Sequence, residues 1–239
     1  MKKDTKVKIF LGLTYISIII LFLWLIFSKF TLSELTSYEF IKNNINYINS
    51  FKQNNFFLIS LIFLIFTIVW ILILGFAAPI FLLGGFIFGK WIGTILVTIG
   101  LSIGATLVYI IANYFFKELI KEKFSKKFFK LNEKFKKNEF LFFLIYRFIG
   151  GIPFVISNVL PCIFNVKVSN FFWATLIGII PQLFIVISIG SGLEKIVDQN
   201  IEPPSIVSII TSPDIYIPLL AFFGLVLITI FIRRFFFQK

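Results

Sequence analysis

Residues 147–161 read RFIGGIPFVISNVLP, and this segment decides how the whole chain is interpreted. It lies in an apolar stretch, Phe140–Gly190, whose only other charged side chain is Lys167 and which contains no carboxylate. An arginine at membrane depth indicates a functional site, and broken backbone there is tolerated only when it is buried in protein or lines a wet cavity. We therefore expect the function to lie in this segment.

The composition is that of a membrane protein. The chain has 239 residues, of which 59% are hydrophobic and 14% charged. Soluble domains are closer to half apolar, with about a quarter of their residues charged. These values predict an all-α, polytopic membrane protein with one membrane domain.

Several kinds of chemistry lack the residues they need. The chain has no histidine and a single cysteine, Cys162, so neither a disulfide nor a metal site is expected. Ser157 and Ser169 have no base to activate them, and no paired carboxylates occur within the apolar stretches. We therefore expect no metal, no cofactor and no enzymatic activity.

Charge is unevenly distributed along the chain, which has a net charge of +12. Residues 117–138 hold nine lysines against three glutamates, both termini are basic, and 191–214 is acidic. The positive-inside rule explains this pattern more simply than nucleic-acid binding does. It places both termini and 117–138 in the cytoplasm and 33–55 and 191–214 outside. Segment 117–138 is then expected to contact anionic lipid headgroups.

The apolar runs divide the chain into three parts. Residues 1–55 are expected to form an uncleaved anchor helix, Ile9–Phe27, and an external segment. Residues 56–195 form the membrane core, and 196–239 form a second external segment with a last transmembrane helix, Ile215–Ile232.

The charge-based topology constrains the core. The chain must cross the membrane an odd number of times in each half, yet each half has two apolar stretches: Phe56–Phe76 and Trp91–Phe116, then Phe140–Ile152 and Phe171–Gly190. Both halves satisfy this constraint if the first apolar stretch enters the membrane, turns and returns to the side it came from, while the second stretch crosses the membrane fully. This predicts two opposed re-entrant helical hairpins, an inverted repeat. The alternative is an ordinary helical bundle with a misassigned basic loop.

The turns are expected at helix breakers, because proline lacks a backbone donor and glycine permits non-helical angles. These hairpin-shaping residues are Pro79, Gly84, Gly85 and Gly89 in the first half, and Gly150, Gly151, Pro153 and Pro161 in the second. Lys90 and Lys167 follow at equivalent places, where the chain returns to the interface.

Two motifs resemble a known family. The run Arg147–Phe154, followed by Asn158, Phe171, Thr175, Gly178 and Pro181, is similar to the second-half signature of the DedA superfamily, in its SNARE-associated Golgi protein branch, the VTT domain. The run Gly84–Gly89, followed by Gly93, Gly100 and Gly104, is similar to that family's glycine-rich motif. The resemblance spans residues 56–195.

The resemblance implies two opposed re-entrant hairpins and the movement of lipids between leaflets, in a bacterial inner membrane. The chain departs from the family pattern at two positions: Gly150 stands where a proline is usual, and Asn113 where an arginine is expected. The acidic residues of proton-coupled members also have no counterpart, since 56–116 and 140–190 contain neither Asp nor Glu.

Four polar side chains are candidates for the site. Arg147 would bind a lipid phosphate through charge-assisted bonds, or would act as a structural lock on the broken helices. Asn158 would contact the headgroup, or would satisfy backbone freed by the prolines. For Asn113 and Gln182 we expect hydrogen bonds between helices.

Three functions remain open. The leading hypothesis is uncoupled translocation of a phospholipid or polyprenyl phosphate across the inner membrane. The alternatives are a carrier for a small anion or another solute, and a non-transporting protein of envelope organisation.

Overall fold

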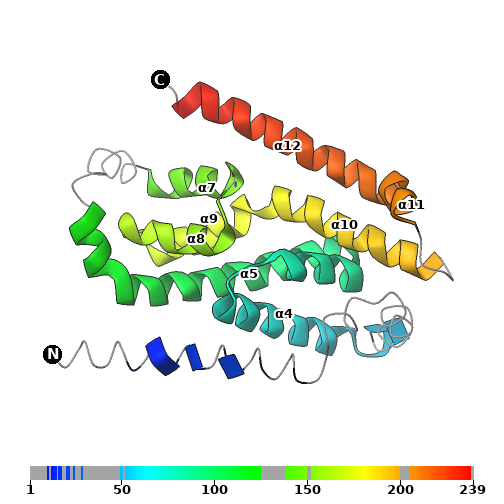
Figure 1. Ribbon diagram of the computed structural model, residues 1–239, viewed down its shortest axis with the longest axis horizontal. Coiled ribbons are helices and arrows are strands. Elements are labelled where there is room, and N and C mark those ends of the chain that lie inside the picture. Colours follow the sequence, from blue (N-terminus) through cyan, green and yellow to red (C-terminus); the bar gives the residue numbers. More distant parts are fainter. Residues whose placement is uncertain are drawn as a thin grey trace.

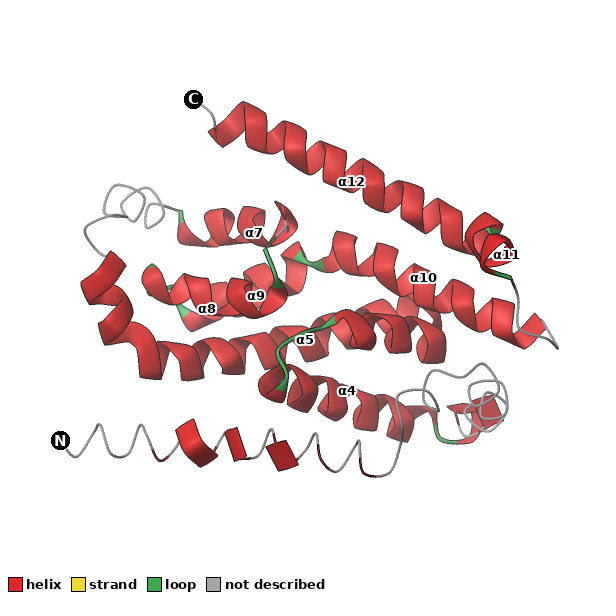
Figure 2. Ribbon diagram, viewed as in Figure 1, coloured by secondary structure: helices red, strands yellow, loops and turns green. Residues whose placement is uncertain are grey.

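The structure is a computed structural model in which every described element is helical (Figures 1 and 2). The described residues are 52–124, 138–149, 152–199 and 205–237, together with positions 10, 12–14, 16, 17, 20, 21, 24, 28, 49 and 50. The predicted anchor helix Ile9–Phe27 falls largely outside these residues, as do Gly150, Gly151 and most of the basic segment 117–138. The expectation of an all-α protein is confirmed over the described part of the chain.

The first half of the core comprises α4 (Phe56–Ile73) and α5 (Ala78–Phe124). Helix α5 is broken at Gly89, whose φ of 72° and ψ of 176° no helix contains and few residues other than glycine adopt. The break separates a short returning arm, 78–88, from a long arm, 90–124. Chain reversal between α4 and the returning arm occurs at Gly75, which has a φ of 75°.

The second half repeats this order with shorter pieces. Its elements are α7 (Glu139–Ile149), α8 (Phe154–Val159), the 3₁₀ helix η1 (Leu160–Ile163), α9 (Val168–Gly178) and α10 (Ile180–Gln199). Helices α8 and η1 together form the returning arm, and α9 and α10 form a long helix with one interruption at Ile179. Two further helices follow, α11 (Ile206–Thr211) and α12 (Pro213–Phe237).

The two halves run in opposite directions. In Figure 1, α4 runs from right to left, whereas α7 runs from left to right. The end of α5 and the end of α12 lie at the left, whereas the end of α10 and α11 lie at the right. Each half thus contains an entering helix, a short returning arm and a long helix, arranged as an inverted repeat.

Each returning arm packs against the long helix of the other half. A Cβ on Gly85 would collide with the carbonyl oxygen of Ile187, and a Cβ on Gly190 with that of Leu82, so the first arm lies directly on α10. The second arm, α8 and η1, packs against α5. This exchange joins the two halves into one unit and fixes the position of each hairpin.

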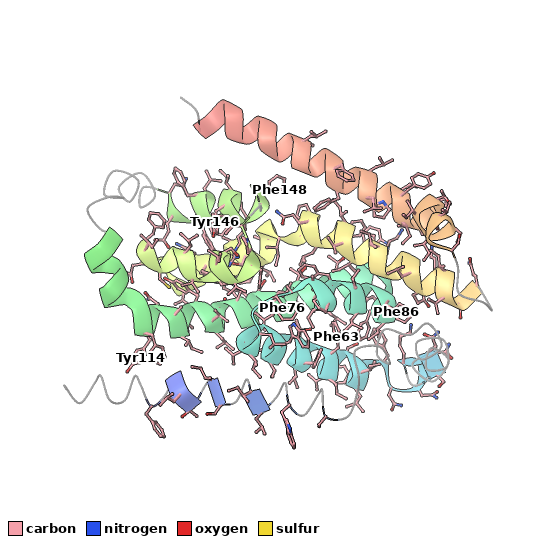
Figure 3. The ribbon with its side chains drawn as sticks, viewed as in Figure 1. Phe63, Phe76, Phe86, Tyr114, Tyr146 and Phe148 are labelled. Carbon is pink, nitrogen blue, oxygen red and sulfur yellow. The ribbon has the colours of Figure 1, made fainter. Side chains whose placement is uncertain are left out.

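The buried side chains form two clusters, one for each hairpin. The first contains Phe63, Ile71 and Ile187. Phe63 lies where α4 faces α5 (Figure 3), and its ring centroid is 5.1 Å from that of Phe88. The second contains Tyr109 of α5, Phe143 of α7 and Phe171 of α9.

Within the described ranges, three helical segments are long and apolar enough to cross a membrane: Phe56–Ile73, Ala78–Phe115 and Ile180–Gln199. Helix α12 covers the predicted last span. The chain is therefore a polytopic helical membrane protein. Insertion of the hairpins from opposite faces without crossing stays a prediction.

One detail of the predicted hairpins requires correction. Gly84 and Gly85 lie inside a helix and form no turn; they are small because Gly84 approaches Val97 and Gly85 approaches Ile187. The first entering helix, α4, has 18 residues and extends about 27 Å. The turn positions are Gly75 and Gly89, with Pro79 in the first turn of the returning arm.

Candidate functional site

Arg147 lies in the last turn of α7, and its side chain is buried in the protein interior. That helix stops at Ile149, and Pro153, with φ −49° and ψ 135°, is the N-cap of α8. Proline disfavours helix in the residue before it and is well suited to the start of the next one. The chain reverses within a few residues, so α8 places its polar side chains beside those of α7.

The Arg147 guanidinium is held by three uncharged oxygen atoms. Its Nε donates to Thr175 Oγ1 (3.0 Å), its Nη1 to Ser157 Oγ (2.7 Å) and its Nη2 to Asn158 Oδ1 (2.8 Å). These acceptors come from α8 and α9, and the side chain is only 4% exposed. One side chain therefore joins three helices of the second half.

Four aromatic rings surround the guanidinium. The Arg147 Cζ atom lies 5.1 Å from the ring centroid of Phe143, 5.6 Å from that of Phe154 and 5.0 Å from that of Phe171. Tyr146, whose ring centroid is 6.0 Å away, lies between α7 and its neighbours in Figure 3. Aromatic faces attract a cation through their quadrupoles, most strongly where water is excluded. The cage stabilises the charge without neutralising it.

No ion pair with Arg147 occurs among the described residues, where the only salt bridge joins Lys195 to Asp214. A guanidinium has five N–H donors, and the three bonds above leave two of them without a described partner. A buried charge without a counterion is costly, and removal of its remaining partners would be costlier still. Within the described part of the chain, the positive charge of Arg147 therefore has no counterion.

A small cavity adjoins the guanidinium. Its volume is about 50 Å³, and its lining includes Arg147, Ser157, Phe154 and Gln182. That volume accommodates a few waters. A larger group would reach the guanidinium only if the walls moved, and one of these walls is Phe154 on the six-residue helix α8.

Gln182 supports the site from α10. Its Nε2 donates to the carbonyl oxygens of Arg147 (3.1 Å) and Phe148 (2.6 Å). These carbonyls lie in the last turn of α7, where a helix has no internal donors for them. The predicted inter-helix hydrogen bonding of Gln182 is confirmed, and it secures the helix end that carries Arg147.

The other residues that the sequence predicted for the site and the hairpins lie in the following places. Asn158 is fully buried; its Oδ1 binds Arg147 and its Nδ2 has no partner among the described residues. Pro161 is buried in η1. The buried Oδ1 of Asn113 accepts no hydrogen bond from the described residues, so the expected bond is not found for this atom. Gly89 forms the break in α5, while Gly150 lies outside the described residues.

Three site residues were not singled out from the sequence for the roles they have. Tyr109 donates a 2.6 Å hydrogen bond to Val166 O and stacks on Phe171 with centroids 4.5 Å apart, which fixes the wall behind the guanidinium. Thr175 and Ser157 bind Arg147 directly. The signal for them is the buried guanidinium itself, since it needs nearby acceptors, but the sequence does not show which hydroxyls come near.

Glu139, the carboxylate nearest to the site along the chain, has a different partner. Its Oε1 accepts from the backbone N–H of Lys167 (2.6 Å) and from Asn170 Nδ2 (2.9 Å). Lys167 is the N-cap of α9, so this carboxylate accepts from one backbone N–H and one side-chain amide at a helix start, where a negative charge is also favourable. Glu139 thus couples the start of α7 to the start of α9.

The chain is similar to known proteins over much of this region. A family model described as the VTT domain matches residues 77–192, which include both returning arms and every residue that binds Arg147. The "Transmembrane protein 41 homolog" of Caenorhabditis elegans is 28% identical over 156 residues, 62% of this chain and 62% of that protein. The protein of the same name from Dictyostelium discoideum is 26% identical over 165 residues, 66% of this chain and 47% of that protein.

A bacterial relative also matches. The "Uncharacterized protein YqeD" of Bacillus subtilis (strain 168) is 30% identical over 112 residues, 46% of this chain and 54% of that protein. The chain spans about half to three fifths of the length of these curated relatives. No solved structure matches it.

Proposed function

Because the chain belongs to the DedA superfamily and carries its VTT domain, we propose that it moves a phosphate-bearing lipid between the leaflets of the bacterial inner membrane. The observation that carries the proposal is the buried guanidinium of Arg147, which has no described carboxylate to neutralise it. A lipid phosphate supplies the missing negative charge. Its tails stay in the bilayer while the headgroup passes the protein.

The donor arrangement suits a phosphate. Guanidinium and phosphate form short, charge-assisted bonds, and a phosphate accepts two of them at once. Arg147 has two N–H groups left for this purpose and lines a cavity. A shift of Phe154 and the short α8, with displacement of water from the cavity, gives the headgroup access.

The hairpins shorten the distance a headgroup must travel. Irregular backbone occurs at Gly89 in one half and around Pro153 in the other, and such backbone inside a membrane lies against protein or water. The proposed path runs past these breaks, where the apolar barrier is thinnest.

Proton coupling is not part of the proposal. Segments 56–116 and 140–190 contain no Asp or Glu, and histidine is absent from the chain. Glu139 is engaged at the start of α9. Movement is therefore expected to follow the lipid gradient alone.

The test is a translocation assay with the full chain in liposomes, using labelled phospholipid and, separately, labelled polyprenyl phosphate. Wild type should move at least one of them, at a rate that an imposed proton gradient leaves unchanged. Arg147→Ala should lower the rate more than tenfold, because loss of a charge-assisted contact at a desolvated site costs about 2 kcal/mol or more.

A matched control separates charge from packing. Tyr109→Phe removes the hydrogen bond to Val166 O, loosens the same wall and leaves the guanidinium in place, so its rate should stay near that of wild type. A wild-type rate no higher than that of protein-free liposomes contradicts the proposal. Uptake of a soluble anion without lipid movement would instead support a solute carrier.

A further inference from the structure

A second groove lies away from Arg147, between α5, α10 and the start of α12. It consists of two adjoining hollows that share the ring of Phe184. One, of about 280 Å³, has a partly polar lining that includes Lys90, Ser188 and Lys195. The other, of about 380 Å³, is mainly apolar: Trp91 and Ile180 are in its wall, and its polar residues are Thr94 and Thr98. We call the pair the α5–α10 groove.

Both walls of this groove change from apolar to cationic in the same direction. On α5, the side chains at Ile99, Ile95 and Trp91 are four residues apart and share one face, and Lys90 follows at the outer end. On α9 and α10, Leu176, Ile180, Phe184 and Ser188 continue at the same spacing, and Lys195 ends the row. Trp91 and Phe184 meet between the walls, with centroids 4.9 Å apart.

At the cationic end of the groove, one lysine is available to bind an anion. Lys195 is paired with Asp214 at 2.7 Å, which also lines the polar hollow. The carbonyl oxygen of Lys90 accepts a hydrogen bond from Thr94 Oγ1, but its ammonium group makes no hydrogen bond or ion pair within the described part of the chain, and the side chain is exposed. The three groups together carry one net positive charge, which complements one phosphodiester.

The groove passes from apolar to aromatic to cationic, and a membrane lipid passes in the same order from acyl chain to interface to phosphate. An apolar hollow open at the side of a spanning helix accommodates an acyl chain. Trp91, which is 68% exposed, marks the level where aromatic residues collect between hydrocarbon and headgroups. A lysine beyond it lies at the level of the phosphate. A soluble anion would make no favourable contact with the apolar wall, and an apolar solute would make no favourable contact with the charge of Lys90.

We propose that the α5–α10 groove binds one glycerophospholipid, with its phosphodiester on Lys90 and an acyl chain in the apolar hollow. The site is separate from the one at Arg147: Phe184 and Ser188 of α10 face the groove, whereas Gln182, on another face of α10, and Ile179, at the interruption before it, line the cavity at the guanidinium. The inference does not depend on translocation and is tested by binding alone.

The experiment is native mass spectrometry of the full chain released from detergent micelles doped with one lipid at a time. The probes are phosphatidylglycerol, phosphatidylethanolamine and the phosphate-free digalactosyldiacylglycerol. Wild type should retain one molecule of a phospholipid and no galactolipid. Lys90→Gln should weaken retention about tenfold, as expected for one charge-assisted bond.

Three further variants complete the design. Ile95→Trp fills the apolar hollow at a position that is 60% exposed, so it should weaken retention without unfolding the chain. Lys167→Gln removes the lysine at the equivalent place in the other half and should retain lipid as wild type does. Arg147→Ala should also leave this binding unchanged, which distinguishes the site from the proposed translocation path.

The proposal is overturned if Lys90→Gln retains lipid as well as Lys167→Gln does, or if the galactolipid is retained equally. It is also overturned if soluble glycerophosphoglycerol displaces the lipid at equal concentration, since the acyl chain would then contribute nothing.

Discussion

At the scale of single residues, the unusual feature is a cation buried among neutral groups. Desolvation of a charged side chain costs several kcal/mol. Three charge-assisted hydrogen bonds at about 1.5–3 kcal/mol each, with aromatic rings on all sides, offset that cost. Arg147 can therefore stay buried and charged while its net charge remains available to an anion. Lysine could not replace it, because an ammonium cannot reach Ser157, Asn158 and Thr175 in one plane.

Gln182→Leu tests the support of this residue. The substitution leaves the carbonyls of Arg147 and Phe148 without their donor, and each unsatisfied buried acceptor costs about 1–3 kcal/mol. We expect a lower thermal unfolding midpoint and faster amide exchange at the end of α7. Ser188→Ala is the control on the same helix, since its hydroxyl only binds Phe184 O within α10; an equal loss in both variants would contradict the assigned role.

At the scale of elements, the returning arms are held by close backbone contact rather than by large side chains. Gly85 lies against Ile187 and Gly190 against Leu82, at distances that no side chain fits between. Small residues at helix contacts are the usual means of association in membranes, where lipid and apolar side chains are equally favourable neighbours. The first arm is thus positioned by α10, and the second by α5.

Gly85→Ala should therefore be strongly destabilising. Its Cβ would overlap the Ile187 carbonyl, which belongs to the backbone of α10 and cannot rotate away. Overpacking of this kind costs about 2–3 kcal/mol. The measurement is thermal or denaturant unfolding in detergent. Gly224→Ala on α12 is the control, because nothing lies within 4 Å of a Cβ there, and it should be neutral or slightly stabilising. Similar stabilities for the two variants would refute the packing argument.

At the scale of the whole molecule, the two halves form an inverted repeat in which, among the side chains that the structure describes, only the second half carries a buried cation. The corresponding space near α4 is filled by apolar groups and hydroxyls, including Thr67, whose Oγ1 has no described partner. The repeat sets the geometry of both hairpins, while the chemistry differs between them. Function at Arg147 is accordingly expected to be asymmetric across the membrane.

Topology is the prediction that belongs to this scale. In a Cys162→Ala background, cysteines at Ser125 and Ser205 should be labelled by an impermeant thiol reagent from opposite faces, Ser125 only after the cytoplasmic side is opened. The reason is the positive-inside rule together with the odd number of crossings between the two positions. Labelling of both from one face would remove the basis for re-entrant hairpins.

A feature of the fold or the site could be predicted from the sequence when it depends on neighbouring residues, and could not when it depends on residues far apart in the chain. Gly89 and Pro153 could be identified as breaks because their effect on φ and on backbone hydrogen bonding is local. The prediction that Gly84 and Gly85 form a turn was wrong. A glycine that turns the chain and a glycine that makes room for a neighbouring helix look the same in the local sequence. Tyr109 was missed because its partner, Val166, lies 57 residues away.

The sequence by itself determined that this is a helical membrane protein with basic segments, two interrupted apolar regions and a lone arginine in the second of these regions. These properties follow from composition, charge order and short-range backbone preferences. Only the tertiary structure decided that the guanidinium binds Thr175, Ser157 and Asn158 and that each returning arm rests on the long helix of the other half. Such choices depend on which surfaces meet when distant segments pack, and in a membrane complementarity of shape and satisfaction of polar groups decide them.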